Sequence, residues 1–169
     1  MNAIVSLNQP LVDRHGLDMN VSRLDFARLK HKYTASSEAD MSVESWDKAE
    51  REYRRFLSLK AFYPAVSLVP SKEVDALWHA HILDTRAYRE DCHQVFGRFI
   101  DHYPYFGIYG EDDYQQLKDA FAQTVALYEK HFGAYPGGGT ETQTMRCGGD
   151  HKCHAPSPCA CRGGPGACK

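Results

Sequence analysis

The aromatic and branched aliphatic side chains of this sequence end at Tyr135, and this limit decides where a folded core can form. From Gly137 onward there is no Leu, Ile, Val, Phe, Tyr or Trp, although that segment holds five of the six cysteines and eight of the thirteen glycines. Such a composition cannot bury enough apolar surface to offset the entropy lost on ordering. We therefore divide the chain into an N-terminal segment (residues 1–19), a folded domain (20–135) and a Gly/Cys-rich irregular tail (136–169).

Within the folded domain, apolar residues recur at steps of three and four, and no segment alternates convincingly with period two. This spacing predicts helices over residues 20–33, 42–63, 71–97 and 112–132. Asp84 and Thr85 are both suitable N-caps, so the third stretch can also be interpreted as two helices. We predict an all-α bundle of four or five helices, with the N-terminal segment extended across it.

The charge of the chain argues against two classes of partner. The sequence has 20 basic and 22 acidic residues, a formal net charge of −2, and no run of five like charges. This pattern indicates neither a nucleic-acid footprint nor a polybasic membrane patch. The first twenty residues do not resemble a signal peptide, and no stretch approaches the roughly 18 apolar residues of a membrane span. We therefore expect a soluble, cytoplasmic protein that binds neither nucleic acid nor membrane.

Polar groups are concentrated in residues 75–92, which otherwise have the pattern of a helix. The candidate site comprises Asp75, His79, His81, Asp84, Tyr88, Asp91, Cys92 and His102. At about 100° per residue, the first two histidines lie roughly 200° apart, so a regular helix cannot direct both to one ion. Asp75 lies four residues before His79, as an aspartate that fixes a histidine tautomer would. We expect His102 to fold back from the loop so that the three histidines converge on this junction.

Three interpretations of this site stay open. In the first, the site is a structural hydrogen-bond network at a helix junction, because each buried polar group left unpaired would cost roughly 1 to 3 kcal/mol. In the second, a metal ion is bound by His79 or His81 together with His102 and either an aspartate or Cys92. In the third, the Cys92 thiolate is a nucleophile activated by His102 or His81.

The same stretch resembles a known family. The residues that carry the resemblance are Asp75, Trp78, His79, His81, Leu83, Tyr88, Asp91, Cys92, Gly97, His102 and Pro104. Their pattern, D-x-x-W-H-x-H followed by Y-x-x-D-C, is similar to the signature of the glycine-rich domain-containing protein-like family. That family occurs in bacteria and as a module of plant glycine-rich domain proteins, and a Gly- and Cys-rich tail suits its bacterial members. The resemblance spans roughly residues 40 to 135 and implies the fold, whereas the family has no settled activity to carry over.

The tail forms a second candidate site. Its potential ligands are Cys147, His151, Cys153, His154, Cys159, Cys161 and Cys168. The cysteine spacing lacks the paired C-x2-C knuckles of zinc ribbons, but thiolates favour soft ions and short loops close at modest entropic cost. We expect the tail to bind zinc or copper(I), or to form labile disulfides; the alternative is an inert appendage.

Two classes of function follow from these patterns. The first is a non-catalytic helical module that binds a protein partner and carries the Cys-rich tail. The alternative is a small metal-dependent enzyme with a His/Asp/Cys site where the third helix meets the His102 loop. An enzyme needs an open cleft and a bound ion, whereas a structural network is closed and free of metal.

Overall fold

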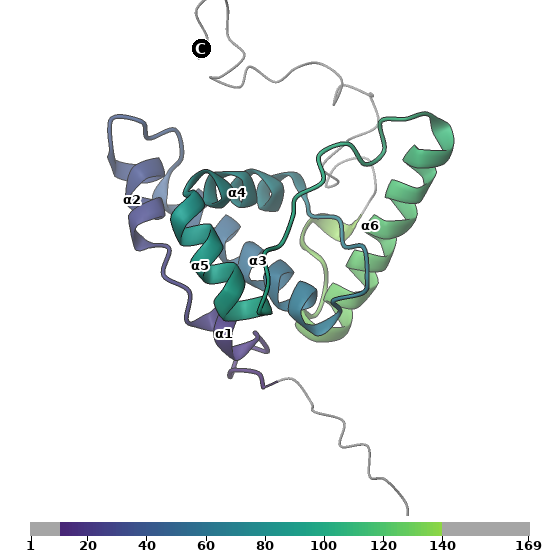
Figure 1. Ribbon diagram of the computed structural model, residues 1–169, viewed down its shortest axis with the longest axis horizontal. Coiled ribbons are helices and arrows are strands. Elements are labelled where there is room, and N and C mark those ends of the chain that lie inside the picture. The colour runs from purple at the N-terminus through teal and green to yellow at the C-terminus, as the bar shows by residue number, and fades with distance from the viewer. Residues whose placement is uncertain (1–10, 140–169) are drawn as a thin grey trace, which may run out of the picture.

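The computed structural model of the chain describes residues 11–139. Its elements are α1 (Met19–Ser22), α2 (Ala27–Ala35), α3 (Val43–Phe62), α4 (Lys72–Leu83), α5 (Thr85–Phe96), α6 (Glu111–Phe132) and a 3-10 turn (Pro136–Gly139) (Figure 1). The described residues contain no β-strand, only an isolated bridge between Val12 and Asp18. The predicted all-α fold is therefore confirmed, with six helices in this part of the chain. None of these helices is both long and apolar enough to cross a membrane.

Helix α3 is the element around which the others pack. It contacts α1, α2, α4 and α6, and in Figure 1 the α4–α5 pair lies on one part of it while α6 lies beside its far end. Three large side chains of α3, Trp46, Tyr53 and Leu59, have no exposed surface. A smaller cluster formed by Val69 and two residues of α6 joins the last helix to the bundle. The core thus consists of side chains from residues 20–135, as the sequence indicates.

Short polar side chains set the helix boundaries. Ser42 and Ser71 accept hydrogen bonds from free backbone N–H groups in the first turns of α3 and α4. Asp84 does the same for α5, so the third predicted stretch is two helices. Gly97 ends α5 with a φ of 67°, a left-handed conformation that glycine adopts without steric cost. The α4–α5 pair is therefore a helical hairpin whose corner is Asp84.

The N-terminal part of the chain differs from the prediction in two respects. Residues 11–18 do not lie extended but form a tight turn, in which the N–H of Met19 donates to the carbonyl of Leu11. The single helix expected over residues 20–33 is interrupted between α1 and α2.

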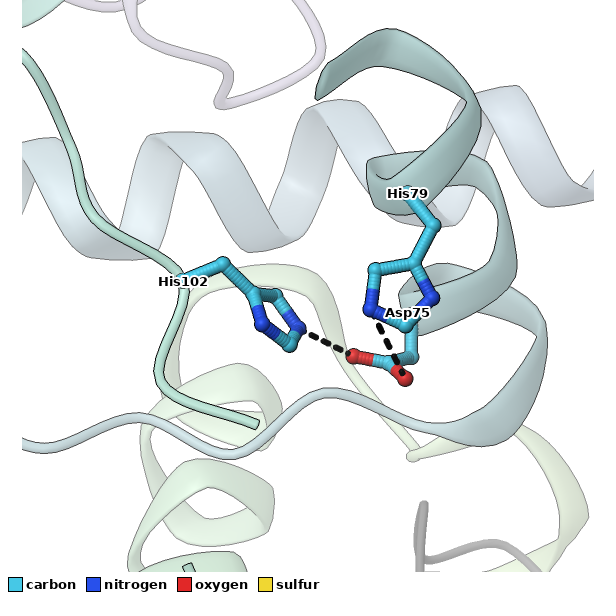
Figure 2. A group of neighbouring side chains, drawn as sticks. All are labelled: Asp75, His79 and His102. Atoms are coloured by element: carbon cyan, nitrogen blue, oxygen red, sulfur yellow. Dashed lines mark hydrogen bonds and ion pairs between the residues drawn. The ribbon is translucent and has the colours of Figure 1, made fainter. Parts of the chain in front are cut away.

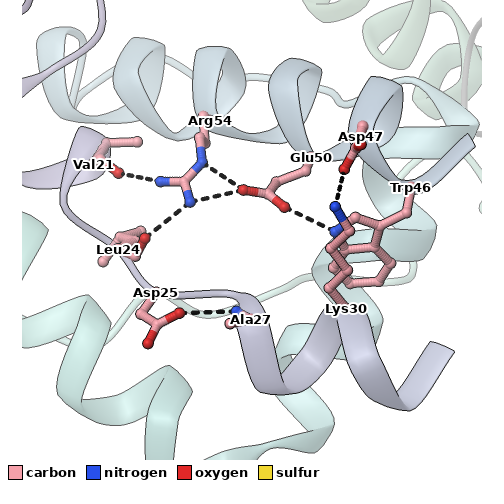
Figure 3. Close-up of polar contacts among 9 residues, drawn as sticks. All are labelled: Val21, Leu24, Asp25, Ala27, Lys30, Trp46, Asp47, Glu50 and Arg54. Carbon is pink, nitrogen blue, oxygen red and sulfur yellow. Dashed lines mark hydrogen bonds and ion pairs between the residues drawn. The ribbon is translucent and has the colours of Figure 1, made fainter. Parts of the chain in front are cut away.

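Arg54 of α3 accounts for the interruption (Figure 3). Its guanidinium donates to the carbonyls of Val21 and Leu24 at 2.8 and 2.9 Å, so these two groups are bound from outside the helix. Glu50 accepts from the same guanidinium at 2.9 Å and holds it in place. The carboxylate of Asp25 accepts from the N–H of Ala27 and starts α2 in a new direction.

The loop of residues 97–110 carries the last predicted site residue past α4 to the start of α6 (Figure 1). Two of its backbone N–H groups, those of Gly107 and Tyr109, donate to the Asp113 carboxylate at 2.8 and 3.0 Å. Gly107 has a φ of 87°, and a Cβ there would lie 2.5 Å from the Leu117 side chain. This close approach fixes the loop against α6.

We expect Trp78→Ala to lower the free energy of unfolding by about 3 to 5 kcal/mol, because the indole is 4% exposed and fills the junction between α4 and the loop. Chemical denaturation followed by circular dichroism would measure the loss. Leu83→Ala, in the same helix at a side chain that is 73% exposed, is the matched control and should change stability by less than about 0.5 kcal/mol. Equal losses in the two variants would contradict this account of the core.

Candidate functional site

Helix α4 places two predicted site residues on one face. Asp75 lies in its first turn and His79 one turn later, so both side chains point to the same side. The Asp75 side chain is 11% exposed, whereas the His79 side chain is 53% exposed. The pair therefore stands at the boundary between the core and solvent.

His102 approaches this pair from the loop (Figure 2). Its Nε2–H donates to Oδ1 of Asp75 at 2.9 Å, while Nε2 of His79 lies 3.8 Å from Oδ2 of the same carboxylate. The two imidazole rings are 4.5 Å apart between centres. One carboxylate thus faces two histidines, and the His102 side chain is only 7% exposed.

A short hydrogen-bonded chain sets the position of His102. The Trp78 indole N–H donates to the Tyr88 hydroxyl at 2.9 Å, and that hydroxyl donates to the carbonyl of Ile100 at 2.6 Å. The loop is thereby fixed two residues before His102, whose ring packs edge-on against Trp78 at 4.6 Å between centres.

Asp75, His79 and His102 form a group of side chains that could hold a metal ion. One ligand atom from each residue can be chosen so that all three lie within 4.8 Å of one another. Zinc bonds to imidazole and carboxylate are about 2.0 to 2.2 Å long, so two ligands of a tetrahedron stand about 3.3 Å apart. The His102 and His79 nitrogens lie 2.9 and 3.8 Å from the two different oxygens of the Asp75 carboxylate, distances of the same order as that value.

His81 belongs to a separate cluster on the opposite face of α4. Its ring is 3% exposed, and Nε2 lies 3.0 Å from the Asp91 carboxylate of α5. Because a carboxylate only accepts, Nε2–H is the donor to Asp91, and Nδ1 pairs with the Tyr53 hydroxyl at 3.0 Å. Burial raises the pKa of Tyr53 well above its usual value, so this hydroxyl keeps its proton.

The structure thus divides the expected polar centre into two. His79 and His102 meet at Asp75, whereas His81 points away, as the angle between positions 79 and 81 predicts. The Asp84 carboxylate accepts from the N–H of Ala87 as the cap of α5, and in the part of the chain that the structure describes its hydrogen bonds to the His81 cluster are made by the backbone alone. The two clusters are linked by way of Trp78 and Tyr88, which contact His102 and His81 through their rings and each other through a hydrogen bond.

Cys92 is buried beside Tyr88 on α5 and is not among the residues that surround Asp75. Burial raises the pKa of its thiol, which disfavours the thiolate that a nucleophile or a zinc ligand requires. The tail ligands predicted at Cys147, His151, Cys153, His154, Cys159, Cys161 and Cys168 lie outside the residues that the structure describes.

Sequence reasoning missed Tyr53 as a partner of the site. Tyr53 recurs with the apolar residues of α3, a spacing that indicates a core position, and its side chain is fully buried. A signal was present, since the hydroxyl of a buried tyrosine usually finds a hydrogen-bond partner. The sequence did not indicate that this partner is His81, 28 residues later.

These features define an all-α domain with a histidine–aspartate junction between a helical hairpin and its following loop. The chain belongs to the UCP032817-like family, which it matches over residues 18–127. It is also 28% identical over 114 residues to glycine-rich domain-containing protein 1 of Arabidopsis thaliana, a match that covers 65% of this chain and 13% of that protein. The predicted resemblance to glycine-rich domain-containing proteins is therefore confirmed. No solved structure matches the chain.

We expect Tyr53→Phe to destabilise the domain by about 1 to 3 kcal/mol, because it leaves Nδ1 of the buried His81 ring without its donor. Urea denaturation would measure the change in the free energy of unfolding. Tyr105→Phe removes a hydroxyl from a half-exposed ring in the loop and serves as the control. A Tyr53→Phe variant as stable as this control would show that the His81 network adds nothing to the fold.

Proposed function

We propose that this domain binds a zinc ion through Asp75, His79 and His102. The observation that carries the proposal is the convergence of three ligand-forming side chains, from one helix face and one loop, within 4.8 Å. Zinc would bind Nε2 of His102 in place of the proton that this nitrogen now donates to Asp75. The proton of the His102 ring would then be on Nδ1.

The exposure of His79 supports an open site rather than a closed structural one. Structural zinc sites have four protein ligands, whereas catalytic sites have three and leave a position for water or substrate. Here three ligands converge, and one of them is 53% exposed. This arrangement favours the small metal-dependent enzyme, with a site of His and Asp and without the buried Cys92.

The test is zinc titration by calorimetry, in a full-length background whose five tail cysteines are changed to serine. We expect one site in this background and an affinity at least tenfold lower after His79→Gln, because one of three ligands is lost. His79 is half exposed, so the variant should fold normally. His93→Gln removes an exposed histidine of α5 and is the matched control.

Equal zinc affinity in the His79→Gln and His93→Gln variants would overturn the proposed site. The same titration of the unaltered chain examines the tail. Zinc or copper(I) bound beyond the amount seen in the background without tail cysteines would support a second, thiolate site there.

A second candidate function rests on the aromatic side chains of the loop. Phe99, Tyr103, Tyr105 and Tyr109 are all at least 44% exposed, although large aromatic rings are usually buried. Tyrosine is enriched in protein–protein interfaces, where the ring packs and the hydroxyl meets water. We propose that this loop contacts a protein partner, as expected of a helical interaction module.

Photo-crosslinking in cells of the source organism would test this second function. A benzophenone amino acid in place of Tyr105 should yield a discrete crosslinked protein, because this side chain lies in the middle of the exposed loop. The same group in place of Glu90, an exposed residue of α5 whose side chain is 70% accessible, is the control. Identical crosslinking patterns at the two positions would contradict a specific interface on the loop.

A further inference from the structure

A cavity of about 200 Å³ lies between the end of α3, residues 67–70 and the loop. Its apolar walls include Leu68, Trp78 and Leu117. Trp78 also packs against His102, so the cavity borders the cluster proposed to bind zinc. None of the three proposed zinc ligands lines the cavity itself.

Lys60, from the last turn of α3, brings a positive charge into this apolar space. Its Nζ lies 5.2 Å from the ring centre of Trp78 and 5.6 Å from that of Phe56. Within residues 11–139, the Lys60 ammonium makes these two cation–π contacts. No carboxylate in that range forms an ion pair with it. A partly buried ammonium without an anionic partner is costly to hold in its charged form.

The charges around the cavity define which anion would suit it. Burial, and to a smaller extent the positive charge of Arg98, lowers the pKa of Lys60. Asp101 also lines the cavity and repels any anion there, a doubly charged ligand more strongly than a singly charged one. The balance favours a monoanion over a phosphate or a dicarboxylate.

We propose that the cavity binds a small monocarboxylic acid with an apolar body, whose carboxylate pairs with Lys60 while the body packs against Trp78 and Leu117. The volume is adequate, because an apolar cavity of about 150 Å³ accommodates benzene. This site goes beyond the proposed zinc centre and does not depend on it.

Benzoate and its neutral isostere benzamide are the probes, titrated into the full chain without added metal. Trp78 lines the cavity and Trp46 is fully buried elsewhere, so quenching of tryptophan fluorescence reports occupancy. We expect saturable binding of benzoate and at least tenfold weaker binding of benzamide. Lys60→Met, which keeps the apolar stem, should weaken benzoate binding at least tenfold.

Lys130→Met is the matched control, since Lys130 also lies over an aromatic ring, that of Tyr63, but on the surface. It should leave benzoate binding unchanged, and so should His79→Gln, which removes a proposed zinc ligand. Thermal melting checks that Lys60→Met is folded; if it is not, the comparison of the two probes in the unaltered chain decides alone. The proposal is overturned if benzoate does not saturate, if benzamide binds equally well, or if folded Lys60→Met binds benzoate like the unaltered chain.

Discussion

The Tyr88 hydroxyl is the group on which the rest of the site depends. It accepts from the Trp78 indole and donates to the Ile100 carbonyl, so it joins α4, α5 and the loop at one atom. Burial raises the pKa of Tyr88 far above its usual value, so the hydroxyl stays a donor at any ordinary pH. With both bonds made, the Trp78 ring is fixed for His102 and the Tyr88 ring is fixed for His81. The geometry of both histidine clusters therefore depends on the hydrogen bonds of the Tyr88 hydroxyl.

Both clusters combine histidine with aspartate, but they differ in their access to solvent. His81 is enclosed, and its two ring nitrogens are both occupied by Tyr53 and Asp91. Such a closed network favours one conformation of the core and leaves no room for a ligand. The Asp75 cluster instead reaches solvent through the half-exposed His79, which keeps one side accessible. The structural interpretation of the sequence therefore fits His81, and the metal site that we propose uses the other two histidines, of which only His79 reaches solvent.

Local signals in the sequence were sufficient for most of the fold. Ser42, Ser71, Asp84 and Gly97 act within one helical turn, so their effect can be predicted without knowing the tertiary structure. The interruption after α1 could not be predicted, because Arg54 binds carbonyls about 30 residues earlier in the chain.

For the candidate site, too, the sequence predicts the local features and not those that depend on tertiary packing. The angle between His79 and His81 on a helix follows from sequence spacing, whereas the pairing of His81 with Asp91 requires the hairpin turn at Asp84. The place of Lys60 beside an apolar cavity also depends on packing, since its position on the α3 stripe predicts only that the stem is covered.

The residues that form the site lie close together along the sequence, and this has a consequence for how the domain folds. Asp75 and His102 are 27 residues apart, Trp78 and Tyr88 only 10, and Tyr88 and Ile100 only 12. By contrast, the bond from Arg55 to Tyr128 of α6 spans 73 residues. Because the entropy of loop closure grows with the length of the loop, the hairpin and its following loop can assemble before α6 docks. The histidine junction thus depends on shorter loop closures than the docking of α6 does, although α6 also contacts the loop through Gly107 and Asp113.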